Sequence, residues 1–159
     1  MMKNIVLARI DDRLIHGQVV TSWVKHTNAT NIVIVDDPLT KNTFMQRLLR
    51  AAAPQDITVQ ILTREDGVNY LSGEAVEGET IILLVKAPEY IEALLDGGVM
   101  MDKVILGGMG AKEGRNRFNR NVSASPEEVE TIRRILARGV EMFYQLVPEE
   151  RAEDVKKLI

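Results

Sequence analysis

The stretch TIILLV, residues 80–85, decides the fold class. A strand this continuously apolar is buried on both faces of its sheet. A helix is predicted directly after it over residues 88–96, and Gly97-Gly98 supplies a left-handed stop. A strand followed at once by a helix is the unit from which covered parallel sheets are built.

The same alternation runs along the whole chain. Further strands are predicted at Ile5–Ala8, Asn31–Val35, Ile57–Leu62, Lys103–Leu106 and Val140–Leu146. Helices are predicted over residues 16–27, 38–52, 64–72 and 126–138, with a last one from about residue 148. We therefore predict an α/β fold: a three-layer α/β/α arrangement with an open, mostly parallel sheet of about six to seven strands and helices on both faces. In such folds, ligands bind beyond the carboxyl ends of the strands.

Prolines mark several of the predicted helix starts. Asp37-Pro38, Ser125-Pro126 and Val147-Pro148 each place proline in a first helical turn, where the missing N–H removes no hydrogen bond. Ser125 and Glu128 have the spacing of a capping box.

The composition limits the classes of function. The 159 residues are 45% hydrophobic and 27% charged, which fits a single domain over residues 1–159. A net charge of −3 argues against nucleic acid as a partner. There is no cysteine, no predicted signal peptide and no apolar run long enough to span a bilayer, so a cytoplasmic protein is expected.

The segment ARIDDRLIHGQV, residues 8–19, carries the chemistry. It follows the first predicted strand and contains Arg9, Asp11, Asp12, Arg13 and His16. An imidazole has an ordinary pKa of about 6.5, so a neutral ring at cytosolic pH could attack phosphorus without a separate base. An arginine fork suits phosphate oxygens, and the free N–H groups of a helix opening at Gly17 attract anions. On residue types alone, an ordinary helix cap or surface histidine with a solvated ion pair is the more common explanation.

This segment closely resembles the N-terminal signature of the IIB subunits of the mannose, fructose and sorbose family of the bacterial phosphotransferase system. The resemblance continues in chain order through five shorter motifs: VDD at 35–37, RAAAP at 50–54, GGV at 97–99, LGGM at 106–109 and RGVE at 138–141. Lys86-Ala87-Pro88 departs from the family pattern, which often has a small hydroxyl or amide residue before the proline, so a polar contact from that loop is not carried over.

The resemblance implies a phosphohistidine carrier. His16 would accept a phosphoryl group from the IIA partner, with Nδ1 as the suggested nitrogen. It would then pass the group to a sugar that enters through the membrane subunits IIC and IID, with which the protein would associate peripherally. Arg13 matches the family's transition-state arginine, and transfer between histidines requires no cofactor and no metal. Which sugar is used is not encoded here.

Other residues receive roles of lower rank. Arg9, Asp12, Gly17, Gly107 and Gly108 are expected to bind phosphate or to shape its site, and Asp11 and Asp12 to orient the loop through backbone N–H groups. The two glycines would form a second wall of the His16 site if the first and fifth strands are neighbours; an ordinary turn is the alternative. His26, at the far end of its helix, is expected to be a surface residue.

The long segment from Gly107 to Ser123 is predicted to be an irregular functional loop. Its arginines 115, 117 and 120 favour a docking surface for an acidic protein over nucleic-acid contacts, with a solvated loop as the plain alternative.

Two functions from different classes remain. One is the phosphocarrier. The other is a regulatory module that binds a phosphorylated ligand without covalent transfer. A free-standing hydrolase fares worse because no base is paired with a water-positioning group, and a homodimer stays open because amphipathic helices can serve either partner.

Overall fold

The computed structural model describes residues 1–159 and forms two sheets with helices around the larger one. The larger sheet has seven strands in the order β3-β2-β4-β1-β5-β8-β9. These strands are β1 Ile5–Asp11, β2 Asn31–Val35, β3 Thr58–Leu62, β4 Ile81–Val85, β5 Lys103–Gly108, β8 Glu141–Tyr144 and β9 Glu153–Asp154. The helices are α1 Gly17–Thr27, α2 Thr43–Ala52, α3 Arg64–Leu71, α4 Pro88–Asp96 and α5 Pro126–Ala137, with two 3-10 turns, η1 Pro38–Lys41 and η2 Val155–Lys157.

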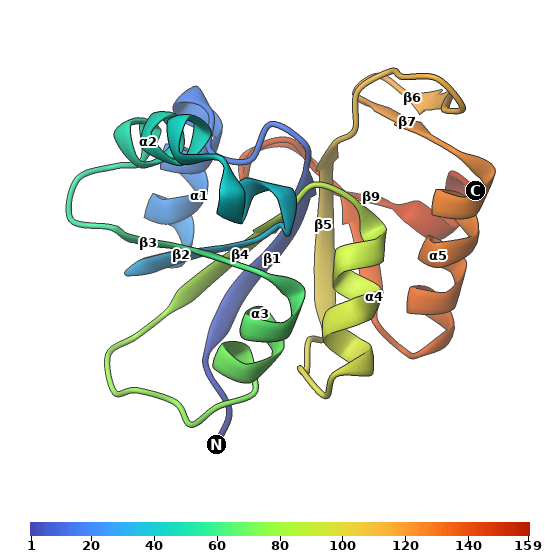
Figure 1. Ribbon diagram of the computed structural model, residues 1–159. Coiled ribbons are helices and arrows are strands. Elements are labelled where there is room, and N and C mark those ends of the chain that lie inside the picture. Colours follow the sequence, from blue (N-terminus) through green and yellow to red (C-terminus); the bar gives the residue numbers. More distant parts are fainter.

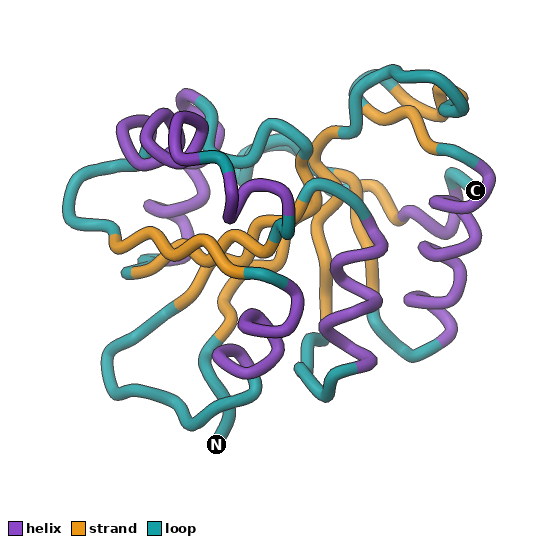
Figure 2. The backbone as a smooth tube through the Cα atoms, viewed as in Figure 1, coloured by secondary structure: helices purple, strands orange, loops and turns teal.

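The predicted three-layer α/β/α arrangement is confirmed, because helices cover both faces of the sheet (Figures 1 and 2). Six strands run parallel, and only β9 pairs antiparallel, to β8. Strand β4 shows how the layers form. Ile81, Leu83 and Val85 pack into one apolar cluster with α3, α4 and α5, whereas Ile82 and Leu84 pack into a second cluster with α1 and α2. The central strand is thus buried on both sides, as its sequence predicts.

The first and fifth predicted strands are neighbours, as expected. Arg9 lies opposite Ile105, and Asp11 lies opposite Gly108 in the β1–β5 pairing. Their carboxyl ends therefore bring the segment after Asp11 beside Gly107 and Gly108. This edge of the sheet lies at the top of Figure 1.

Two of the predicted helices need correction. The helix predicted over residues 38–52 is two elements, because Asn42 leaves helical backbone angles and its side chain caps a new helix by accepting from the Met45 N–H. The helix predicted from residue 148 does not form. That highly charged segment has too few apolar residues for a buried helix face, and instead it folds back as β9 beside Tyr144 and places Val155 in the core.

The segment Gly107–Ser123 is less irregular than predicted. It contains β6 Asn116–Asn119 and most of the antiparallel hairpin that this strand makes with β7 Val122–Ala124. Turn residues Arg120 and Asn121 join the two strands. The hairpin stands at the same edge as the loop after β1 (Figure 1).

None of the helices combines the length and apolar character needed to cross a membrane.

Candidate functional site

The chain between β1 and α1 is a tight, anchored loop. The Leu14 N–H donates to the Asp11 carbonyl at 2.9 Å. Leu14 has a φ of 57°, a left-handed conformation that leucine rarely adopts. Its side chain is buried together with that of Ile15, and this burial holds the unfavourable backbone in place. His16 then occupies the N-cap position of α1 without capping the helix itself.

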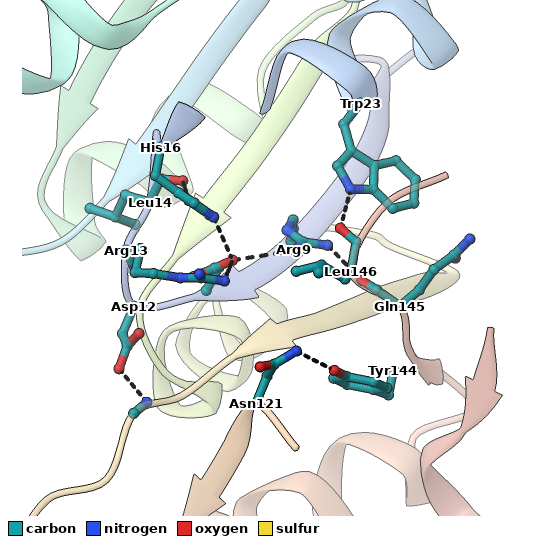
Figure 3. A network of polar contacts seen from close by, with 12 residues as sticks. Arg9, Asp12, Arg13, Leu14, His16, Trp23, Asn121, Tyr144, Gln145 and Leu146 are labelled. Carbon is teal, nitrogen blue, oxygen red and sulfur yellow. Dashed lines mark hydrogen bonds and ion pairs between the residues drawn. The ribbon is translucent and has the colours of Figure 1, made fainter. Parts of the chain in front are cut away.

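The carboxylate of Asp11 is the centre of the polar network that joins Arg9, Arg13 and His16. Figure 3 labels these three residues. Asp11 is fully buried. Its Oδ1 accepts from the Arg13 backbone N–H at 3.0 Å and from Arg13 Nε at 3.2 Å, while Oδ2 accepts from Arg9 Nη2 at 3.2 Å. Two arginines thus compensate one buried carboxylate, and the expected role of Asp11 in orienting the loop through a backbone N–H is seen directly.

His16 lies over this network with its side chain mostly enclosed. Its Nε2 is 3.9 Å from Asp11 Oδ2, and this atom is buried without a hydrogen-bond partner. Its Nδ1 lies 3.3 Å from the Leu14 carbonyl oxygen. Burial lowers the pKa of His16 below its ordinary value, although the negative charge of Asp11 works in the opposite direction. The ring is therefore neutral at pH 7 and keeps a lone pair for attack.

Arg13 and Arg9 play different parts. Arg13 is half-exposed, at 49% of its side chain, so its outer edge is free to meet a ligand. Arg9 is buried; its Nη1 donates to the Gln145 carbonyl at 2.8 Å, and its guanidinium lies over the Trp23 ring. This geometry argues against the direct phosphate contact expected of Arg9 and makes it a support for Asp11.

Gly107 and Gly108 form the second wall of the site. A Cβ atom on Gly107 would overlap the guanidinium of Arg9, and one on Gly108 would lie 3.1 Å from Arg13 Nη2. The Gly108 carbonyl accepts from the Asp12 N–H at 3.0 Å. Gly107 is therefore required for the close approach of Arg9 to β5, and Gly108 leaves room for Arg13, so both glycines contribute to the site through backbone shape.

Asp12 does not face the phosphate position. Its carboxylate points away from His16 in Figure 3 and accepts from the Gly110 N–H at 2.7 Å. It also pairs with Arg115 at 3.5 Å. Asp12 thus fastens the first loop to the segment after β5, which is the orienting role considered for it, and the expectation of direct phosphate binding is not supported.

Of the three arginines in the hairpin region, Arg115 is not available for docking. Only 5% of its side chain is exposed, and it binds both carboxylate oxygens of Glu128 at 2.9 Å. Arg117 and Arg120 are exposed. They line a cavity of about 500 Å³ that also includes Arg13, Asn121 and Ser123. Arg120 pairs with Glu150 at 3.3 Å, whereas Arg117 forms no ion pair, so the hairpin adds one uncompensated positive charge beyond Arg13.

The remaining candidates lie outside this constellation. His26 is exposed in the last turn of α1, as expected, and meets the edge of the Trp23 ring. Lys86 is part-buried and forms no ion pair. No group of three or more His, Asp or Glu side chains is arranged to hold a metal ion.

Three residues that support the site, Trp23, Gln145 and Leu146, were not predicted from the sequence. Trp23 Nε1 donates to the Leu146 carbonyl at 2.9 Å, beside the bond from Arg9 to Gln145. These contacts join positions more than a hundred residues apart in the chain. No local sequence motif marks these contacts. The packing of Trp23 on α1 against Arg9 on β1 becomes visible only in the folded structure.

Comparisons with known proteins agree on one family. The family model described as "PTS system sorbose subfamily IIB component" matches residues 5–159. The mannose-specific EIIAB component of Escherichia coli (strain K12) is 37% identical over 136 residues, which is 86% of this chain and 42% of that protein. The chain thus spans less than half of that relative's length.

Two further relatives match over nearly their whole length. The sorbose-specific EIIB component of Lacticaseibacillus casei is 32% identical, with 95% of this chain and 92% of that protein covered. The solved structure of the IIBSor domain of the sorbose permease from Klebsiella pneumoniae superposes with a TM-score of 0.92 at 31% identity, covering 97% of this chain and 94% of that one.

Proposed function

The chain belongs to the sorbose-subfamily IIB family of the phosphotransferase system, and from this premise we propose that His16 carries the phosphoryl group. The observation that supports this most strongly is the placement of the His16 ring. It lies at the N-terminus of α1 beside the half-exposed Arg13, and burial keeps the ring neutral. A neutral nucleophile, a fork of donors and free helix N–H groups therefore meet at one point.

We infer that Nδ1 is the accepting nitrogen. Nε2 faces the Asp11 carboxylate, whose negative charge would repel an incoming phosphoryl group. Nδ1 is the alternative, and its weak contact with the Leu14 carbonyl must break when the ring receives phosphate. Transfer to Nδ1 requires the tautomer with its proton on Nε2, where the proton points at Asp11 and the negative charge of the carboxylate favours it.

The transfer itself is an exchange of one P–N bond for another. Nδ1 of His16 attacks the phosphorus of the IIA phosphohistidine in line, the partner's N–P bond breaks, and its electron pair returns to the partner's imidazole. Arg13 and the first N–H groups of α1 stabilise the charge on the equatorial oxygens. In the second half of the cycle, the oxygen of a sugar hydroxyl attacks the phosphorus of phospho-His16. The P–N bond breaks, its electron pair returns to Nδ1, and the hydroxyl proton passes to solvent.

The second transfer is proposed to occur at membrane subunits IIC and IID, so the chain would work in the cytoplasm as a peripheral partner of those subunits. Because a carrier must donate what it accepts, the phosphorylated state should be only moderately favourable.

A second candidate function is favoured by the cavity of about 500 Å³ beside Arg13. Together with Arg117 and Arg120, it could hold a phosphorylated ligand non-covalently, which would make the chain a regulatory module. The two functions differ in whether a covalent phosphate forms.

Intact mass after incubation with phosphoenolpyruvate, the general phosphocarriers and a IIA protein tests the proposal. We expect a gain of about 80 Da, lost in acid and stable in base, which is the behaviour of phosphohistidine. The gain should vanish in His16→Ala and persist in His26→Ala, the matched control with the only other histidine. Absence of the gain with a demonstrably active donor mixture would favour the non-covalent module.

A further inference from the structure

Helix α2 exposes much more of itself than it buries. Of its ten residues, only Leu49 is buried. Phe44 is 64% exposed, Leu48 49% and Met45 37%. These three are half of the large apolar residues that the molecule exposes, and all lie on one helix. Helix stability in proteins comes mostly from packing an apolar face against a neighbour. The exposed apolar face of α2 has no such neighbour within this chain.

The border of this apolar surface is basic. Residues 38–55 contain Lys41, Arg47 and Arg50 and no acidic residue, although the whole chain carries a net charge of −3. Arg50 donates to the Val59 carbonyl and so is tied to β3, whereas Lys41 and Arg47 are exposed without an ion pair. We call Phe44, Met45 and Leu48, with Lys41 and Arg47, the α2 face.

The α2 face flanks the His16 loop. Strands β2 and β1 run parallel within one sheet, so the segment that follows β2 begins at the same edge as the loop after β1. Leu39 of η1 and Leu49 of α2 belong to the same buried apolar cluster as Leu14 and Ile15. In Figure 1, η1 and α2 lie at the upper edge together with the segment after β1.

We propose that the α2 face is the docking surface for the phosphoryl donor, a protein whose own surface is apolar with an acidic border. This rests on the proposed function of His16 as acceptor. To bring its phosphorus to bonding distance of His16, the donor must cover the surroundings of the loop. A stable protein interface buries roughly 800 Å² on each partner. Arg13 and the loop are too small for that, and the adjoining α2 face supplies apolar area with charges that select an acidic partner.

Two other occupants fit less well. A second copy of the chain, paired through the same face, would offer Lys41 and Arg47 no opposite charge, because residues 38–55 contain no acidic residue. Membrane binding would depend on one ten-residue helix with three partly exposed apolar side chains and two unpaired basic side chains. That is a weak membrane anchor. A bilayer over α2 would also crowd the approach to His16.

The experiment compares the double variant Phe44→Ser/Leu48→Ser with wild type, using a purified phosphorylated IIA protein that phosphorylates the wild-type chain. We expect KM for phospho-IIA to rise about tenfold or more, as for loss of an interface hot spot, with kcat within about twofold. The charge variant Arg47→Glu should raise KM as well, and this rise should shrink at high salt. The matched control is Val76→Ser/Met100→Ser, which removes two exposed apolar residues far from this edge and should leave KM unchanged.

Phosphoramidate serves as a second donor that needs no docking surface. Its P–N bond breaks with loss of ammonia as the bond to His16 forms, so the α2 variants should react with it at the wild-type rate. This arm separates the two proposals. Failure of phosphoramidate and phospho-IIA alike to label wild-type His16 would remove the proposed function, whereas normal labelling with an unchanged KM in the α2 variants would remove the docking surface alone.

Two further outcomes would overturn the docking proposal in favour of another occupant. One is an unchanged KM together with wild-type binding to phosphatidylglycerol-containing vesicles that the double variant loses. The other is a wild-type dimer in sedimentation that dissociates in the double variant without any change in KM.

Discussion

Oδ2 of Asp11 lies 3.9 Å from Nε2 of His16, and both atoms are buried. The distance is too long for a hydrogen bond, and Nε2 has no other hydrogen-bond partner. A small movement of the ring toward Asp11 would close the contact and release Nδ1 from the Leu14 carbonyl. Asp11 therefore affects two properties at once: the stability of the loop that it anchors and the protonation state of the His16 ring.

Replacement of Asp11 by asparagine should lower the pKa of His16 further, because the carboxylate is the charge that raises it against the effect of burial. The same change leaves the buried Arg9 without its counter-charge and should cost about 3 kcal/mol of unfolding free energy. NMR titration of the His16 ring and urea denaturation measure the two effects. Asp12→Asn is the control for the titration, since that carboxylate points at Gly110; an unchanged or raised pKa in Asp11→Asn would contradict the role assigned to Asp11.

Phosphorylation of His16 should gain little rate as pH rises above about 6.5, because the folded pKa lies below that ordinary value and the ring is already neutral. As pH falls through the folded pKa, the rate should drop. Single-turnover labelling with phosphoramidate across pH 5 to 8 gives the profile without a partner protein, with the range chosen around the reference value of about 6.5. A midpoint above the ordinary value would show that Asp11 outweighs burial.

The same shift predicts how stability depends on pH. The unfolded chain binds a proton at His16 below about pH 6.5, whereas the folded chain resists it until the lower folded pKa is reached. The contribution of His16 is therefore fully present above pH 6.5 and is lost as pH falls toward the folded value. The unfolding free energy of wild type, measured by denaturation, should therefore fall relative to that of His16→Gln as pH drops below about 6.5, whereas the difference between the two proteins should stay constant above that pH.

Substitution of Arg13 should affect mainly the transfer rate, whereas substitution of Arg9 should affect mainly the stability. Arg13→Lys keeps a charge but loses the planar fork, so the rate of phosphoryl transfer should fall roughly tenfold to a hundredfold with little change in stability. Arg9→Lys cannot reach both Asp11 and the Gln145 carbonyl, and its unfolding free energy should fall by about 3 kcal/mol. Rapid-quench kinetics and denaturation of both variants decide this; a stable Arg9→Lys with normal loop structure but slow transfer would return Arg9 to the phosphate site.

Gly107→Ala should destabilise the protein by about 1 to 3 kcal/mol, because the added methyl group overlaps the Arg9 guanidinium and neither group has room to move. Gly110→Ala is the matched control. Its Cβ would lie 3.4 Å from Asp12 Oδ2, an ordinary contact. Thermal unfolding of the pair compares them directly, and equal midpoints would mean that β5 can shift away from Arg9.

Much of the fold could be predicted because its signals are local. The apolar run at 80–85 and the capping box at Ser125 and Glu128 both appear in the structure where the sequence places them. The errors came where local signals compete. Pro148 indicates a helix start, but the residues after it offer no apolar stripe for a helix to bury. The segment pairs with β8 as strand β9 instead.

The sequence by itself determined the order of the six parallel strands and the five α-helices, the loop that holds His16, and the family resemblance that the comparisons later confirmed. Hydrophobic period, caps and short motifs are properties of neighbouring residues, so they can be read without coordinates. Only the tertiary structure decided which side chains of that loop are free. Arg9 is enclosed by Gln145 and Trp23, Asp12 turns to Gly110, and Arg13 stays open. Those outcomes depend on burial and on partners from distant strands, and neither is encoded at the positions themselves.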